Sequence, residues 1–234
     1  YDMNKQEIKK EFEKYSFVLT EEKQEMFLIF LNTLKEYNGK FNITSIKEDD
    51  QIIEKHFIDS LMGEKCFLKG ASVVEIGSGG GFPALPIKIM RPYLKITLVD
   101  ATEKKCEFLK TVVKKLGLSD VEVIYGRAED LAKNDLYREK FDICTARAVA
   151  RLNVLSEYCI PFVKKGGIFV SYKGDAEEEI KESEKAIKIL GGKIITHDKY
   201  VLDGAKRTLV IVEKQKNTDP KYPRSNARIK NKPL

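Results

Sequence analysis

The chain has 234 residues, of which 42% are hydrophobic and 33% are charged. Such a composition can bury a core, which excludes an intrinsically disordered chain, and the length suits one large domain with an added subdomain. The longest uncharged stretch, Ile76–Ile87, has twelve residues, whereas a transmembrane helix needs about 20 apolar ones. The N-terminus is charged from Asp2 onward and shows no signal-peptide pattern, so we expect a cytoplasmic protein with no membrane span.

Cysteine and histidine are too few and too scattered to suggest a metal site. The four cysteines form no C-x-x-C pair, and only His56 and His197 could join them. We therefore expect no bound metal and four free, buried thiols. No G-x-S-x-G segment is present, so a serine hydrolase would lack its nucleophile motif.

The net charge of +6 is unevenly distributed along the chain. Residues 1–70 carry 11 basic and 14 acidic side chains, residues 71–214 carry 25 and 21, and residues 215–234 carry six and one. The last segment also holds three prolines and few core-forming residues, so we expect it to be extended. Two interpretations remain open, a frayed solvated terminus and a basic arm that binds phosphate backbones. Tyr222 within it could stack on a base, which favours RNA slightly.

Residues 1–70 are expected to form an N-terminal helical subdomain. Thr20 can cap a helix that carries two glutamates in its first turn, where negative charge is favourable. Apolar residues then recur at helical spacing as far as Asn38-Gly39. A second helix is expected over about 50–62. Because no strand pattern separates these helices, they should form a cap on the main domain.

Residues 71–214 alternate between strand and helix patterns. Short apolar strands are expected at 72–76, 96–99, 121–125, 141–145 and 168–172. Two closing strands, 193–201 and 208–213, follow without a helix between them and should pair antiparallel. The alternation predicts an α/β fold, a doubly wound and mostly parallel sheet of seven strands with an antiparallel last strand. The expected division is a cap (1–70), a main domain (71–214) and a basic C-terminal arm (215–234).

A glycine-rich turn, EIGSGGGFP at residues 75–83, follows the first strand and precedes a helix. Glycines let the backbone approach a ligand closely. The dinucleotide fingerprint fails because Phe82 occupies its third glycine position, and no Gly-Lys-Ser/Thr follows for a P-loop. The remaining pattern, E-x-G-x-G-x-G, is typical of Rossmann-like class I methyltransferases that use S-adenosylmethionine. Asp100, at the end of the next strand, is placed to bind both ribose hydroxyls.

Several ordered motifs give the chain a more specific resemblance. It resembles the glucose-inhibited division protein B family, the 16S ribosomal RNA (guanine-527-N7) methyltransferases, over essentially its whole length. The segments that carry the resemblance are FNITSI (41–46), EKHFIDSL (54–61), EIGSGGGFPALPIKI (75–89), LVDATEKKCEFL (98–109), GRAED (126–130), TARAVA (145–150), YKG (172–174) and KYPR (221–224).

The turn and the resemblance together imply a pocket for S-adenosylmethionine. Asp100 would hold the ribose, Ala128 and Glu129 would meet the adenine, and Arg147 would lie at the pocket mouth. The full expected set is Gly77, Gly79, Phe82, Asp100, Ala128, Glu129 and Arg147. Each assignment has a structural alternative: turn geometry for glycine, core packing for phenylalanine, a surface carboxylate for glutamate and an ion pair for arginine. For His56 and Asp59 we favour anchoring of the cap helix over catalysis.

The resemblance implies 16S ribosomal RNA, the small subunit or its assembly intermediate as the partner. Guanine N7 has an in-plane lone pair and no proton, so its methylation needs positioning and no general base. Arg147 or Arg207 could read guanine O6 or a phosphate. The expected RNA-binding residues are Lys104, Lys105, Arg151, Lys173, Arg207, Tyr222 and Arg224.

Other functions stay open at this point. A small-molecule methyltransferase would turn over without RNA and would have no use for the basic tail. A ribosome assembly factor could hold the cofactor and turn over slowly. A nicotinamide oxidoreductase is disfavoured by Phe82. We expect a monomer, since no exposed dimer seam is evident in the sequence.

Overall fold

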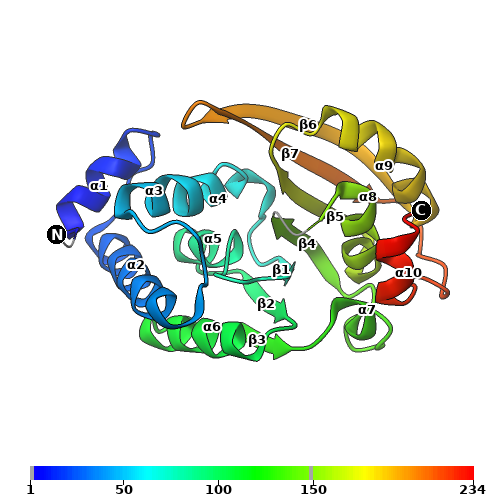
Figure 1. Ribbon diagram of the computed structural model, residues 1–234, viewed down its shortest axis with the longest axis horizontal. Coiled ribbons are helices and arrows are strands. Elements are labelled where there is room, and N and C mark those ends of the chain that lie inside the picture. Colours follow the sequence, from blue (N-terminus) through cyan, green and yellow to red (C-terminus); the bar gives the residue numbers. More distant parts are fainter. Residues whose placement is uncertain (1–2, 148–149) are drawn as a thin grey trace.

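One seven-stranded β-sheet organises the chain, with strand order β3-β2-β1-β4-β5-β7-β6. The computed structural model describes residues 3–147 and 150–234. β1 to β5 pair in parallel, whereas β7 is antiparallel to both β5 and β6. This confirms the predicted α/β class and the antiparallel closing pair. The strands are β1 (Ser72–Ile76), β2 (Lys95–Asp100), β3 (Val121–Tyr125), β4 (Phe141–Arg147), β5 (Val163–Lys173), β6 (Gly192–Leu202) and β7 (Ala205–Lys214) (Figure 1).

Helices cover both faces of the sheet, because each connection between parallel strands crosses over it. Successive strand residues face opposite sides, so Val73 packs in the core below α5 and α6, and Val74 packs in the core on the other face. The helices of the main domain are α5 (Ala84–Met90), α6 (Glu103–Lys115), α7 (Ala128–Leu131), α8 (Leu152–Cys159), the 3₁₀ turn η3 (Ile160–Phe162) and α9 (Glu177–Ile189).

The N-terminal helices pack directly onto α5 and α6 (Figure 1). Thr20 caps α2 as predicted, since its hydroxyl accepts a hydrogen bond from the Lys23 amide, and α2 continues to Phe41. The buried rings of Phe27 and Phe30 belong to the same core as Val73 of the sheet. The helical region and one face of the sheet therefore share one core. Its elements are α1 (Lys5–Glu13), α2 (Glu21–Phe41), α3 (Asp49–Ile52), the π-helix η1 (Ile53–Ile58), α4 (Asp59–Leu61) and the 3₁₀ turn η2 (Glu64–Cys66).

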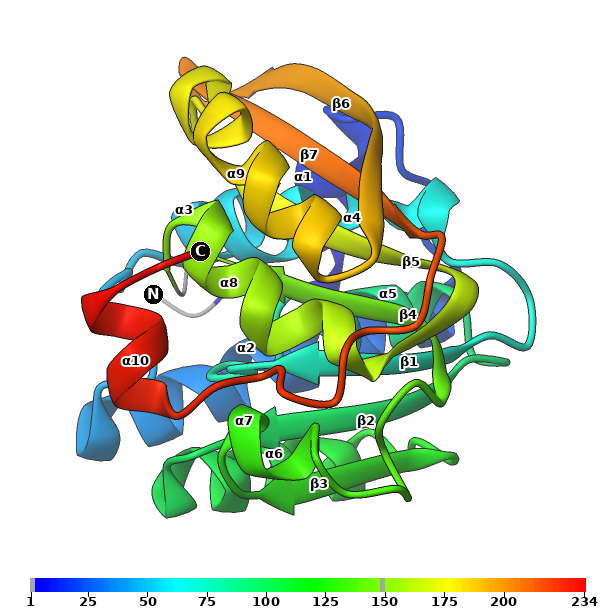
Figure 2. The same cartoon turned by 90° about the vertical axis from the view of Figure 1, so that its right-hand side faces the viewer.

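The C-terminal segment is packed and partly helical, so the prediction of an extended tail is wrong. After β7 the chain runs along α8 and forms α10 (Asn226–Asn231) beside it (Figure 2). Ile229 is fully buried, and Arg224 forms an ion pair with Glu157, whose side chain is only 1% exposed. The sequence suggested an extended tail because it holds three prolines and few core-forming residues. Tertiary anchoring through single residues such as Ile229 leaves no such signal.

Two further boundaries differ from the sequence analysis. Arg147 is the last residue of β4 and does not follow it. Asp175 is suited by residue type to cap the following helix, yet α9 begins after Ala176 without a side-chain cap, and Asp175 pairs with Lys206. Within the described ranges, no helix is both long and apolar enough to cross a membrane.

Candidate cofactor and substrate site

The glycine-rich turn between β1 and α5 requires glycine for its backbone. Gly77, Gly79 and Gly81 have φ angles of 66°, 54° and 81°, a left-handed region that other residues rarely adopt. A Cβ atom on Gly81 would lie 2.5 Å from the Leu85 side chain, whereas one on Gly79 would meet nothing nearer than the Gly77 oxygen at 3.8 Å. The turn is therefore packed against the protein at Gly81 and open above Gly79. That open space is what close approach of a ligand requires.

Asp100 ties this turn to the end of β2. Its Oδ2 atom accepts a hydrogen bond from the Gly79 amide and its Oδ1 atom accepts one from the Thr102 amide, each at 2.8 Å. The side chain is 6% exposed. Each carboxylate oxygen keeps a further lone pair, so Asp100 can hold the turn and still accept ribose hydroxyls.

A pocket of about 200 Å³ lies beside this carboxylate, and we name it the Asp100 pocket. Ile76, Gly77 and Val99 place it over the carboxyl ends of β1 and β2. Ligands of open α/β sheets bind at this edge, near the point where the strand order reverses. The remaining lining residues are Asp100, Ala101, Gly126, Arg127, Ala128, Glu129, Ala150, Tyr158, Asn226 and Lys230.

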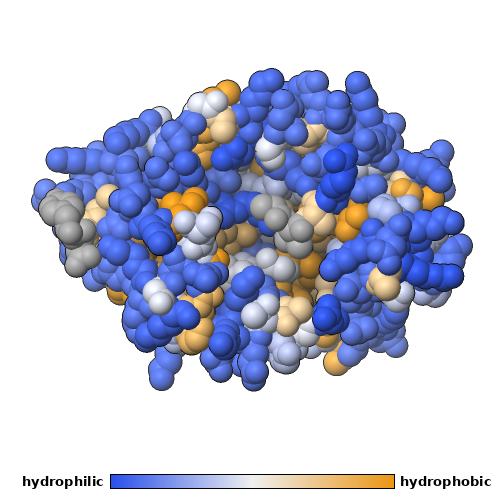
Figure 3. Space-filling view, viewed as in Figure 1, coloured by the Kyte–Doolittle hydropathy of each residue, from blue (hydrophilic) through white to orange (hydrophobic). Residues whose placement is uncertain are grey.

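A second pocket, of about 380 Å³, lies at the ends of the adjoining strands β4 and β5, and we name it the Arg147 pocket. Since β1 and β4 are neighbours in the sheet, the two pockets occupy adjoining positions along one edge. In the view of Figure 1, the surface of the protein is mostly hydrophilic (Figure 3). The lining of the second pocket is strongly polar: Ile46, Lys55, His56, Asp59, Arg147, Tyr172, Lys173, Gly174, Glu179 and Arg207.

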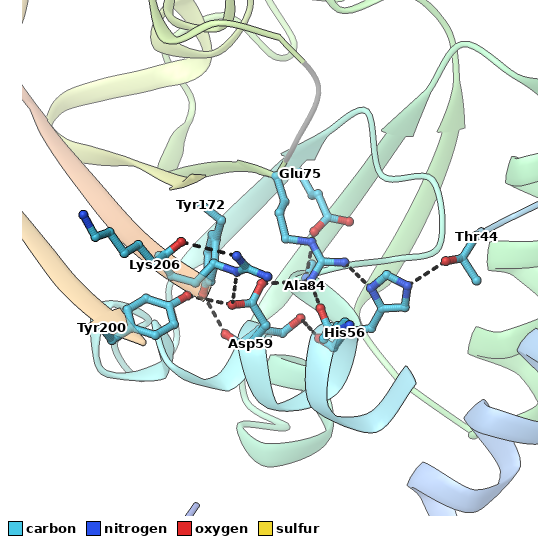
Figure 4. Close-up of polar contacts among 12 residues, drawn as sticks. Thr44, His56, Asp59, Glu75, Ala84, Tyr172, Tyr200 and Lys206 are labelled. Carbon is cyan, nitrogen blue, oxygen red and sulfur yellow. Dashed lines mark hydrogen bonds and ion pairs between the residues drawn. The ribbon is translucent and has the colours of Figure 1, made fainter. Parts of the chain in front are cut away.

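Arg147 is held by three acceptors from the cap helices. Its Nη1 atom donates to the Lys55 carbonyl at 3.0 Å and to Asp59 Oδ2 at 3.2 Å, and its Nη2 atom donates to His56 Nδ1 at 2.7 Å (Figure 4). Its guanidinium carbon also lies 5.1 Å from the centre of the Phe82 ring. The side chain is 13% exposed, so the cap fixes the guanidinium at the pocket wall.

The hydrogen bonds of His56 define its tautomer. An arginine can only donate, so Nδ1 accepts from Arg147 and the proton is on Nε2, which donates to Thr44 Oγ1 at 2.7 Å. The ring also stacks on Phe82 with a centroid distance of 4.5 Å. Burial, together with the charge of Arg147, lowers the pKa of His56 to about 3. His56 is therefore neutral at physiological pH, in a widened π-helical turn of the kind often found at functional sites.

Glu75, the first residue of the turn motif, is a buried carboxyl group between the two pockets. Its Oε1 atom accepts a hydrogen bond from the Ala84 amide at 2.7 Å, and its Oε2 atom has no partner within the described chain. Burial raises the pKa of Glu75 to about 8. The neutral acid is therefore favoured at pH 7, which removes an otherwise uncompensated buried charge.

The structure brings together four of the residues expected to bind the cofactor. Gly77, Asp100, Ala128 and Glu129 line the Asp100 pocket. Gly79 supports them through its bond to Asp100. Phe82 and Arg147 lie apart: Phe82 is 7% exposed and packs under His56, and Arg147 lines the second pocket. Contact of Phe82 and Arg147 with the cofactor stays a prediction. Residues 148 and 149 of the TARAVA motif (145–150) lie outside the described residues.

The residues expected to bind RNA fall into distinct environments. Lys173 and Arg207 line the Arg147 pocket, and Lys104 and Lys105 open α6 directly after β2. Arg151 is exposed and pairs with Glu182. Arg224 is engaged with Glu157, and Tyr222 packs partly against the core. Lys173 pairs with Glu179 at 2.8 Å and is only 8% exposed, whereas Arg207 is 25% exposed. The geometry thus favours Arg207 among the residues that line this pocket, and it makes Arg224 an anchor of the tail.

Sequence reasoning missed Tyr158, Asn226 and Lys230 as pocket residues. They come from α8 and α10, far along the chain from the glycine-rich turn. No local motif marks them, because only the tertiary path of the tail brings α10 to the pocket.

The fold and the two pockets define a class I methyltransferase that uses S-adenosylmethionine. Solved structures share this fold: precorrin-6y C5,15-methyltransferase from Geobacter metallireducens has a TM-score of 0.51 at 12% identity, covering 68% of this chain and 87% of that one. TYW2 of M. jannaschii in complex with AdoMet has a TM-score of 0.53 at 14% identity, covering 67% and 76%.

Sequence similarity identifies the family to which the chain belongs within this class. The family model of rRNA small subunit methyltransferase G matches residues 23–209. Ribosomal RNA small subunit methyltransferase G of Lactobacillus acidophilus is 45% identical, over 99% of this chain and 100% of that protein. The protein of that name in Clostridium novyi is 47% identical, over 92% and 90%. The chain belongs to the rRNA small subunit methyltransferase G family, which confirms the resemblance seen in the sequence.

Proposed function

We propose that this protein transfers the methyl group of S-adenosylmethionine to N7 of a guanine in 16S ribosomal RNA. The observation that supports the proposal is the pair of adjoining pockets at one edge of the sheet. The Asp100 pocket suits the adenosine part of the cofactor, since it combines an open glycine turn with a carboxylate for the ribose. The Arg147 pocket suits a nucleotide, since its cations can donate to guanine O6 or to phosphate.

The chemistry of N7 agrees with the groups around the Arg147 pocket. S-adenosylmethionine, when bound, supplies an electrophilic methyl group on its sulfonium. Asp59 is poorly suited to act as a base, because it is ion-paired with Arg147 at 3.2 Å, accepts from Tyr200 at 2.8 Å and has a side chain only 7% exposed. His56 has its acceptor nitrogen occupied by Arg147. A nucleophile that carries no proton needs none of these groups as a base, and positioning alone can serve it.

The test is transfer of labelled methyl to small-subunit RNA that lacks this modification. Borohydride reduction followed by aniline cleavage should then cut the RNA at one guanine, because only an N7-methylated guanine is sensitive to that treatment. Naked RNA, assembly intermediates and intact subunits should be compared as substrates. Transfer at another atom, or transfer to small molecules without RNA, would contradict the proposal; cofactor binding without turnover on all RNA forms would favour an assembly factor.

Arg207→Gln tests the assignment of the second pocket. Arg207 lines it with a side chain 25% exposed, so its loss should lower methyl transfer about tenfold while cofactor affinity stays unchanged. Lys206→Gln is the matched control, because the neighbouring Lys206 side chain is 76% exposed and pairs with Asp175. Equal losses in both variants would mean general charge attraction and no specific site.

Because its substrate is ribosomal RNA, we propose that the protein acts in the cytoplasm. We also propose that it acts as a monomer.

A further inference from the structure

The C-terminal helix α10 lies against the Asp100 pocket. Asn226 and Lys230, one turn apart on α10, line this pocket together with Gly77, Asp100 and Glu129. The chain before α10 is firmly held: Arg224 donates from its amide and its guanidinium to Glu157 at 2.7–3.0 Å. Ile229, three residues after Asn226 on the same helix, is fully buried. The placement of α10 is thus set by buried contacts, and the pocket lacks one wall without it.

The side chain of Asn226 has a defined orientation. Its Oδ1 atom accepts a hydrogen bond from the hydroxyl of Tyr158 on α8, and Tyr158, 7% exposed, lines the same pocket. Because the oxygen is held by this phenol, the amide NH₂ of Asn226 remains as a donor. Within the described residues, that NH₂ group donates no hydrogen bond to the protein.

We propose that α10 forms the adenosine-side wall of the cofactor pocket, with the Asn226 amide as a hydrogen-bond donor to the adenosine and Tyr158 as the residue that positions it. This inference rests on the proposed function. Adenine offers ring nitrogens as acceptors, which the carboxylates of Asp100 and Glu129 cannot satisfy. Arg127 and Lys230 also line the pocket and can donate, but Asn226 is an uncharged donor whose orientation is set by a hydrogen bond from a buried phenol. The tail of this chain is accordingly part of the cofactor site.

Calorimetry with S-adenosylmethionine and S-adenosylhomocysteine tests this inference on the full chain. Asn226→Ala should weaken both ligands by the same factor, about fivefold, because both contain the same adenosine and one hydrogen bond is lost. Tyr158→Phe should weaken both by a smaller factor. Asn231→Ala is the matched control, since Asn231 is exposed at the far end of α10 and its loss should leave both affinities unchanged.

Deletion of residues 226–234 should weaken both ligands at least tenfold, with Arg224 and Glu157 still paired. Thermal unfolding of each variant shows whether the rest of the fold is intact. Normal affinity in a folded Asn226→Ala protein would overturn the assignment of Asn226, and normal affinity in the deletion would overturn the wall itself. A wild-type protein that binds neither ligand would instead overturn the proposed function.

Discussion

At the residue scale, the site depends on buried groups whose protonation is set by their surroundings. His56 is neutral because burial and the adjacent Arg147 charge lower its pKa to about 3. This neutrality lets Nδ1 accept from Arg147, which a protonated imidazole could not do. Asp59 then carries the negative charge that balances the guanidinium at 3.2 Å. The network positions one cation at the Arg147 pocket without a free base nearby.

Glu75 gives a prediction on the alkaline side of the pH range. Burial raises its pKa from 4.5 to about 8, so the folded state holds its proton more tightly than the unfolded chain does. That contribution to the free energy of unfolding is fully present below pH 4.5 and is lost as the pH rises through about 8. Glu75→Gln keeps an acceptor for the Ala84 amide and removes the titration.

Chemical denaturation between pH 5 and pH 9 should therefore show a stability that falls with rising pH in the wild type and falls less in Glu75→Gln. Glu122→Gln, an exposed change on β3, is the control and should follow the wild type. Parallel curves for wild type and Glu75→Gln would show that the carboxyl group is not titrating in this range.

At the element scale, the tail shows where composition misleads. Its prolines and few core-forming residues predicted an extended segment, yet Arg224 neutralises the buried Glu157 and Ile229 packs in the core. Deleting residues 217–234 should therefore lower thermal stability, whereas the loss of a frayed terminus would change it little. Leaving Glu157 as an unpaired buried charge costs about 3–5 kcal/mol in comparable cases.

Differential scanning calorimetry can check this with a graded pair of deletions. Removal of 232–234 alone, which leaves Arg224 and Ile229 in place, should change the melting temperature little. If adding Glu157→Gln to the 217–234 deletion raises its melting temperature again, the unpaired carboxylate is the cause of the loss. A melting temperature that both deletions leave unchanged would mean that the tail is frayed after all.

The elements themselves were well predicted from the sequence where a local signal exists. The strands at 72–76 and 121–125 match β1 and β3 at both ends, because short apolar runs bounded by turns are a strong signal. The turn at Gly77–Gly81 and the place of Asp100 beside it were also evident, since motif and fold agree; the ribose role of Asp100 stays a prediction. The sequence did not predict the packing of α10 over the pocket or the hydrogen bond between His56 and Arg147, because each joins segments about 70 to 90 residues apart.

At the scale of the whole molecule, the cap and the β6–β7 hairpin meet around the Arg147 pocket. Tyr200 of β6 donates to Asp59 at 2.8 Å, and Lys55 pairs with Asp203 at 3.0 Å. The hairpin extends over the cap helices (Figure 1), so both ends of the sequence help to enclose one pocket. Mutations in either part should thus affect the same substrate step, although the two lie far apart in the chain.

The distribution of charge gives the final prediction, on RNA binding. Lys104 and Lys105 open α6 at the sheet edge that carries both pockets, and Lys104 lies 5.0 Å from the centre of the Phe41 ring. If these lysines contact phosphates, the double variant Lys104→Ala/Lys105→Ala should make the slope of log affinity against log salt shallower by about 0.7 for each lost contact on single-stranded RNA.

The matched control is Lys9→Ala/Lys10→Ala, which removes the same charge from α1, at the far end of the cap (Figure 1). Its slope should stay near the wild-type value, because charge beyond about 10 Å is screened at 0.1 M salt. Fluorescence anisotropy with the unmodified RNA over a salt series measures both slopes. If the two double variants shift the slope equally, the attraction comes from net charge as a whole, and α6 is not part of the RNA-binding rim.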